Sequence, residues 1–130
     1  MNAIFRKLIF VFAFAFTILS SFAQLTGKVL EQKTVKSVAL GRDVKYTIYL
    51  PGDYDYSQRN YPVVYLLHGY TDDNTGWLQF GEINRYADKA IAEGIIPPMI
   101  IVMPDANTGK RGYSNDVTNA WRYKISFPRS

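Results

Sequence analysis

A short apolar run at residues 63–67 ends abruptly in a histidine and a glycine, His68 and Gly69. The run has no alternation of polar and apolar residues, which predicts a central strand covered on both faces, as in a parallel sheet flanked by helices. Gly69 allows the backbone to turn tightly just beyond the carboxyl end of this strand. Open α/β sheets bind their ligands at that end. We therefore expect a site around Tyr70.

The N-terminal residues have the pattern of an export signal. Two basic residues precede an apolar run at residues 8–19, which is too short to span a bilayer comfortably, and small residues follow at Ser21 and Ala23. We predict a cleaved signal peptide at residues 1–23 and a mature, exported domain at residues 24–130. An uncleaved membrane anchor is the alternative, but the short run and the cleavage pattern disfavour it.

Composition narrows the class of protein further. The chain has no cysteine, which excludes lipid attachment at the signal and excludes disulfides, so packing must stabilise the fold. Removal of Arg6 and Lys7 with the leader leaves 13 of the 15 basic residues against 11 acidic ones, a net charge of +2. Basic residues are not clustered among aromatic ones, so we expect no nucleic-acid partner.

The segment before the apolar run predicts a hairpin. Residues 28–40 and 44–50 place apolar residues among charged ones, as strands with one solvated face do. Gly41 and the two residues after it form a turn between them. We expect an antiparallel hairpin at the edge of the sheet.

The segment after the apolar run predicts a helix and a second buried strand. Residues 82–93 carry an apolar stripe with helical spacing, formed by Ile83, Tyr86, Ala87, Ala90 and Ile91. Gly94 is a suitable stop for this helix. Residues 99–103 are again continuously apolar. Strand, helix and strand form a βαβ unit with parallel strands.

Two loops carry polar and aromatic residues. The tyrosines of residues 51–60 suit either a sugar-binding surface or ordinary packing of a surface loop, and packing is the commoner finding. Residues 70–77 contain two aspartates and an asparagine but lack the spacing of a calcium loop. We expect these polar side chains to cap helices or face solvent, and we expect no metal or other cofactor.

Four segments together resemble the N-terminal part of the putative-esterase family: residues 40–51, 61–69, 76–77 and 99–106. That family has the α/β-hydrolase fold and includes esterase D, feruloyl and acetylxylan esterases, and mycolyltransferases. The resemblance extends from about residue 37 to residue 123. It implies an α/β fold in which an N-terminal antiparallel hairpin precedes a parallel βαβ unit.

The resemblance also implies a serine hydrolase that acts on small-molecule or saccharide esters, with a Ser-His-Asp/Glu triad and backbone donors for the oxyanion. In this family the residue after His-Gly supplies one such donor, here the backbone N–H of Tyr70. His68, Gly69 and Asp105 are implied to support that loop. His68 is the only histidine, but the family's catalytic base lies near its C-terminus, so we interpret His68 as structural.

No nucleophile elbow is present in these 130 residues. Ser114 lies in a partial Gly-x-Ser motif, but Asp116 replaces the second glycine and no strand precedes it, so we do not assign Ser114 as the nucleophile. The resemblance fades after Tyr123. We therefore expect a truncated or frame-shifted gene product, an N-terminal fragment without turnover of its own.

Two other functions remain open on the sequence. An acyltransferase would use the same scaffold but pass the acyl group to a sugar hydroxyl instead of water. A noncatalytic carbohydrate-binding domain would use the tyrosines of residues 51–60.

Overall fold

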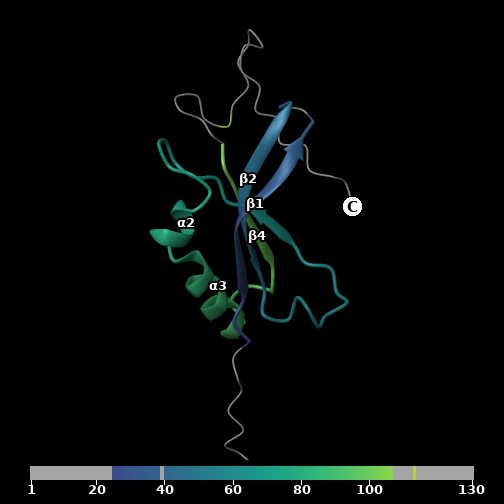
Figure 1. The fold of residues 1–130 in the computed structure, drawn as a ribbon. Coiled ribbons are helices and arrows are strands. Elements are labelled where there is room, and N and C mark those ends of the chain that lie inside the picture. Colours follow the sequence, from purple (N-terminus) through teal and green to yellow (C-terminus); the bar gives the residue numbers. More distant parts are fainter. Residues whose placement is uncertain (1–24, 39, 107–112, 114–130) are drawn as a thin grey trace, which may run out of the picture.

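The computed structural model describes residues 25–38, 40–106 and 113 (Figure 1). The predicted signal peptide, residues 1–23, lies outside them. The elements in chain order are β1 (Lys28–Ser37), β2 (Arg42–Leu50), β3 (Val63–Tyr65), α2 (Gly76–Gln79), α3 (Ile83–Ala92) and β4 (Ile100–Pro104). The four strands form one mixed sheet in the order β1-β2-β4-β3. No helix in the described part of the chain is long and apolar enough to cross a membrane.

The N-terminal hairpin is confirmed. β1 and β2 pair antiparallel and occupy one edge of the sheet, with Ser37 opposite Arg42 next to the turn. The turn includes Gly41 with a φ of 64°, a conformation that glycine adopts without strain. β2 begins at Arg42, two residues earlier than the alternation of residues 44–50 indicated. The first residues after a tight turn can pair before the apolar pattern starts.

The parallel βαβ unit is also confirmed. β3 and β4 pair in parallel, with Val64 beside Ile101, and α3 lies between them in the chain. α3 ends at Ala92 with Glu93 as its C-cap, and Gly94, the predicted stop, follows with a φ of 69°. The Ile95 amide donates to the Ala90 carbonyl over 2.9 Å and so satisfies one of the last carbonyls of the helix. β4 pairs antiparallel with β2 on its other side.

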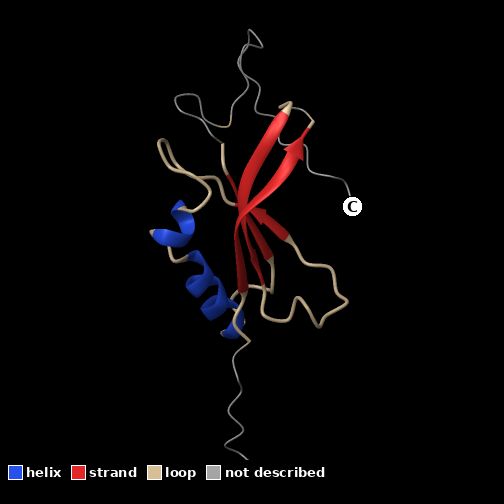
Figure 2. Ribbon diagram, viewed as in Figure 1, coloured by secondary structure: helices blue, strands red, loops and turns tan. Residues whose placement is uncertain are grey.

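Both helices lie on the same side of the sheet (Figure 2). The core forms where α3 packs on β2 and β4, and its buried members are Tyr49, Ala87, Ile101 and Met103. Partly buried apolar side chains surround them: Val29, Leu66, Ile83, Ile91 and Met99. Tyr86 belongs to the predicted apolar stripe, but the structure leaves 62% of it exposed. The helix buries a narrower face, centred on Ala87.

The prediction of a central strand covered on both faces at residues 63–67 was also wrong for the described sheet. β3 contains only Val63–Tyr65, lies at the edge, and leaves between 38% and 45% of each residue exposed. The physical reason is that the helices cover one face only and that β4 is the only described neighbour of β3. A continuous apolar run indicates that a strand favours burial, but it does not show which strands pair with it or which helices cover its faces.

One half-buried carboxylate, that of Asp88, joins the helical layer to the sheet. The Tyr49 hydroxyl donates to Asp88 Oδ1 over 2.7 Å, and the Gly27 amide donates to the same oxygen over 2.7 Å. Burial raises the pKa of Tyr49, and the hydrogen bond to Asp88 raises it further. Tyr49 therefore stays neutral and keeps donating its proton. This contact fixes α3 against β2 and the start of β1.

The first prediction concerns this contact. Tyr49→Phe should lower the free energy of unfolding by about 1–1.5 kcal/mol, because it removes one buried hydrogen bond while keeping the ring. Urea denaturation followed by circular dichroism measures the change. Tyr86→Phe is the matched control, since an exposed hydroxyl should contribute less than about 0.5 kcal/mol. Equal stability of the Tyr49→Phe variant and the wild type would contradict the assignment.

The second prediction concerns the edge formed by β3. In the described sheet β3 lies at the edge and leaves apolar surface exposed. Exposed apolar edge strands promote association, so the 130-residue chain should self-associate and sediment as species larger than a monomer. Val63→Lys should shift sedimentation towards the monomer, because a charge on an edge strand opposes pairing. Val38→Lys adds the same charge at an exposed site away from this edge and should leave association unchanged. A monodisperse wild-type monomer argues against this role of the edge.

Candidate active-site loop

The chain leaves β3 and turns sharply within a few residues. The Leu66 amide still donates to Val102 O over 2.9 Å, which extends the pairing of β3 with β4 by one residue. The Trp77 indole N–H, from the start of α2, donates to Leu67 O over 2.9 Å. The indole therefore fixes the last extended residue before His68. Trp77 belongs to a family segment, but sequence reasoning assigned it no role.

Residues 69–72 form a tight turn in which the Asp72 amide donates to Gly69 O over 3.3 Å. Tyr70 and Thr71 occupy its two central positions. Thr71 has a φ of 68°, which is rare for a β-branched residue and costs on the order of 1–3 kcal/mol. Such strain persists only where neighbouring contacts hold the backbone in place.

His68 supplies those contacts from a buried position. Its Nε2 accepts a hydrogen bond from the Ala106 amide over 3.0 Å, so that nitrogen carries no proton. In the neutral ring the proton then lies on Nδ1, which donates to Gly69 O over 2.8 Å. Asp105 Oδ1 lies 3.6 Å from Nε2, and the shorter contact with Ala106 decides the tautomer. Both ring nitrogens of the only histidine are therefore in use.

The Gly69 carbonyl determines the direction of the Tyr70 amide, because both belong to one planar peptide. That peptide is trans, so the Tyr70 N–H points opposite to the carbonyl that His68 and Asp72 hold. Among the described residues, the Tyr70 amide donates no hydrogen bond. The loop thus presents an oriented backbone donor beyond the carboxyl end of β3.

Tyr113 completes the network and was missed by sequence reasoning. Its hydroxyl accepts from the His68 amide over 3.2 Å and donates to Pro104 O over 2.9 Å. Its ring meets the His68 ring edge-on, with 5.2 Å between the ring centroids. Tyr113 precedes Ser114, which lies outside the described residues, so the local motif was examined only for a nucleophile. A tyrosine whose partners lie far away in the chain gives no local signal.

Asp105 lies where the sequence predicted, directly beyond β4. Its amide donates to Lys45 O over 2.9 Å, which prolongs the pairing of β4 with β2. The structure therefore brings His68, Gly69, Tyr70 and Asp105 together at one end of the sheet. Their catalytic and supporting roles remain predictions.

The polar loop that follows is stabilised internally. Thr75 donates to Asp73 Oδ1 through its amide and its hydroxyl, each over 2.7 Å, and so Asp73 orders the start of α2. The buried Asn74 side chain donates to Thr47 Oγ1 on β2 over 2.8 Å. In the described part of the chain, no group of three metal-ligating side chains comes together.

The fold and this loop identify the structural class of the protein. The described residues form the N-terminal part of an α/β-hydrolase sheet, with an antiparallel hairpin followed by a parallel βαβ unit, which confirms the predicted fold class.

Comparison with known proteins identifies the family. Residues 37–126 match the family model described as putative esterase, and the chain belongs to that family. It is 36% identical over 78 residues to an endo-1,4-beta-xylanase/feruloyl esterase from Xylanibacter ruminicola. The structure is similar to that of a ferulic acid esterase, with 32% identity and a TM-score of 0.68. It also resembles a ferulic acid esterase from Anaeromyces mucronatus solved with ferulic acid, with 28% identity and a TM-score of 0.55.

These matches cover most of this chain but only part of each relative. The Xylanibacter ruminicola match covers 57% of the chain and 11% of that protein. The two structural matches cover 78% and 75% of the chain, and 38% and 34% of the solved chains.

The third prediction concerns pH. The hydrogen bonds from the Thr75 hydroxyl and amide lower the pKa of Asp73. A lowered folded-state pKa means that Asp73 stabilises the protein above its ordinary pKa and that this stabilisation is lost as the pH falls through the folded value. Asp73→Asn should therefore lower the melting temperature at pH 7, and the difference from wild type should be smaller at about pH 3, below the ordinary pKa of an aspartate.

Thermal unfolding at both pH values measures this effect. Glu31→Gln, on the exposed face of β1, is the matched control and should show no such difference. An Asp73→Asn deficit that is the same at both pH values would refute the role of the charge.

Proposed function

We propose that this chain is the N-terminal part of an exported serine carboxylic-ester hydrolase that deacylates carbohydrate esters of the feruloyl or acetyl type. Membership of the esterase family and the α/β-hydrolase fold support the reaction class. The relatives named as feruloyl esterases support the choice of acyl group. The substrate is a small-molecule or saccharide ester, and no metal or cofactor takes part.

The observation that carries the proposal is the oriented amide of Tyr70. Attack on an ester carbonyl places negative charge on the carbonyl oxygen, and a fixed N–H in a dry site stabilises that charge without reorganising. His68 and Asp72 hold the Gly69 carbonyl, which keeps the Tyr70 N–H turned away from the turn and available to an acyl group. Tyr70 is the catalytic residue that this chain contributes, through its backbone.

The nucleophile, the acid and the base of the triad come from sequence other than the described residues. His68 does not serve as the base, since both of its ring nitrogens hold backbone groups. The 130 residues contain no other histidine, so the chain alone should show no turnover.

The fourth prediction tests the donor. Tyr70→Pro removes the amide hydrogen and suits the second position of a turn, where proline is common. It should lower kcat for methyl ferulate by about 10²–10³-fold in the product of the complete gene, because one oxyanion donor is lost.

Tyr70→Ala is the matched control. It keeps the N–H and removes a side chain that is 68% exposed, so kcat should fall far less than with proline. Equal loss in both variants would assign the effect to the side chain instead. Release of ferulate to water, rather than transfer to added xylose, distinguishes the hydrolase from an acyltransferase.

The fifth prediction concerns export. Basic residues, a short apolar run and small residues at Ser21 and Ala23 support removal of residues 1–23. The protein should appear in the periplasm or the medium of its source cell, and N-terminal sequencing should begin at Gln24. Recovery of uncleaved protein from the membrane fraction would indicate an anchor.

A further inference from the structure

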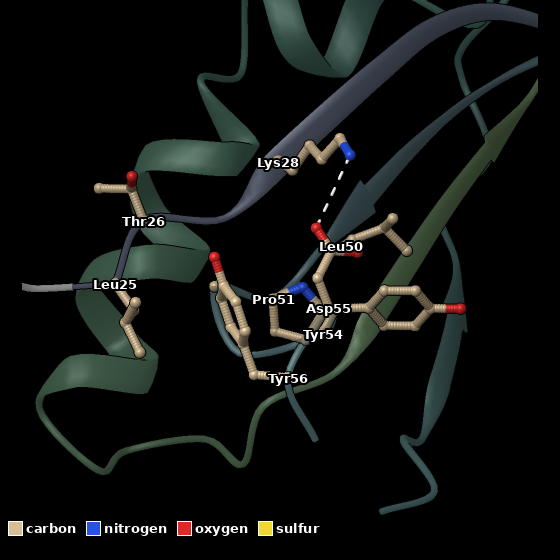
Figure 3. Close-up of a pocket in the computed structure, with 9 residues that line it drawn as sticks. Leu25, Thr26, Lys28, Leu50, Pro51, Tyr54, Asp55 and Tyr56 are labelled. Atoms are coloured by element: carbon tan, nitrogen blue, oxygen red, sulfur yellow. Dashed lines mark ion pairs between the residues drawn. The ribbon is translucent and has the colours of Figure 1, made fainter. Parts of the chain in front are cut away.

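We propose that the hollow beside Tyr56, at the end of the sheet opposite the Tyr70 loop, binds a neutral saccharide chain. The choice of a saccharide rests on the proposed function, whereas the site itself is separate from the ester-cleaving centre. Three segments form it: the residues leading into β1, the end of β2, and the turn at residues 53–57 (Figure 3).

The hollow has the size and the mixed lining of a small ligand site. Its volume is about 280 Å³, just below the roughly 300–1,000 Å³ found for ligand pockets. Leu25 and Pro51 supply apolar surface, and Tyr54 and Tyr56 supply aromatic rings. Figure 3 shows the Tyr56 ring on the same side of Pro51 as Leu25 and Thr26, which line the hollow with it.

The turn that carries these tyrosines is fixed by its own hydrogen bonds. The Tyr54 amide donates to Pro51 O over 2.9 Å, and the Tyr56 amide donates to Asp53 O over 3.1 Å. The Arg59 guanidinium pairs with the Asp53 carboxylate across the base of the turn. A ligand would therefore meet a preformed surface and would lose little free energy in ordering it.

Tyr56 is the main contact that we infer. It is 81% exposed on a hydrogen-bonded turn, whereas Pro51, just before that turn, is fully buried. An exposed, well-held aromatic face stacks on the C–H face of a sugar ring, and the phenol hydroxyl binds a sugar hydroxyl.

The charges at the rim favour a neutral ligand. Lys28 Nζ lies 3.7 Å from Asp55 Oδ2, and both side chains are largely exposed. The pair carries no net charge, so it attracts neither anions nor cations strongly. Each group still offers donors or acceptors to sugar hydroxyls. An acidic or basic ligand would have to break the pair.

The strand register separates this hollow from the Tyr70 loop. Tyr46 on β2 lies opposite Pro104, next to the loop, whereas Leu50 and Pro51 are at the other end of β2. Five residues of strand span about 17 Å. A polysaccharide long enough to reach both ends could bind here while an acyl group on it reaches Tyr70.

Titration calorimetry with xylohexaose and with maltohexaose tests the proposal on the same protein as the esterase assay. The wild type should bind at least one of them. Tyr56→Ala should weaken binding roughly tenfold, because a lost aromatic stack of this kind corresponds to about one decade in affinity. Tyr56→Phe should bind within about threefold of wild type, since it keeps the ring.

Tyr86→Ala is the matched control, because it removes an exposed tyrosine from α3 outside the hollow and should bind like wild type. Far-ultraviolet circular dichroism confirms that each variant is folded. Failure of the wild type to bind either sugar, or equal binding by Tyr56→Ala and Tyr86→Ala, overturns the site. Tyr56-dependent binding without hydrolysis of methyl ferulate would leave the site standing and reject the esterase function.

Discussion

The arrangement of the Tyr70 loop at one end of the sheet depends on one buried imidazole, that of His68. β3 contributes only three residues to the sheet, and His68 then bridges the chain beyond β3 to the chain beyond β4 through Gly69 O and the Ala106 amide. Tyr113 adds a second bridge between the same two ends. Because one ring nitrogen must donate and the other accept, this bridge requires the neutral form of His68.

The architecture could largely be predicted from the sequence because its signals are local. Apolar residues placed among charged ones on either side of Gly41 predict the hairpin. Apolar residues with helical spacing, followed by Gly94, predict α3. Apolar runs joined by a helix predict a parallel pair. Each pattern lies within a window of about ten residues, the range over which backbone geometry controls periodicity.

The parts that could not be predicted depend on distant partners. His68 and Tyr113 are 45 residues apart, and Asn74 and Thr47 are 27 residues apart. No periodicity links such pairs. The exposure of β3 and of Tyr86 likewise depends on which surfaces are covered, and an apolar residue does not specify its neighbour. The turn beyond β3 was predictable, but the contacts that hold Tyr70 were not.

The strand order also has a consequence for biosynthesis. Within the described sheet, β4 is the only strand that touches β3, and it is made after the whole helical segment. The nascent apolar residues of β3 therefore emerge from the ribosome well before their parallel neighbour exists. Non-local strand pairing of this kind is slow, and the apolar surface of β3 stays exposed and prone to aggregation until β4 pairs with it. A chaperone that delays collapse until Pro104 has been made would protect this chain.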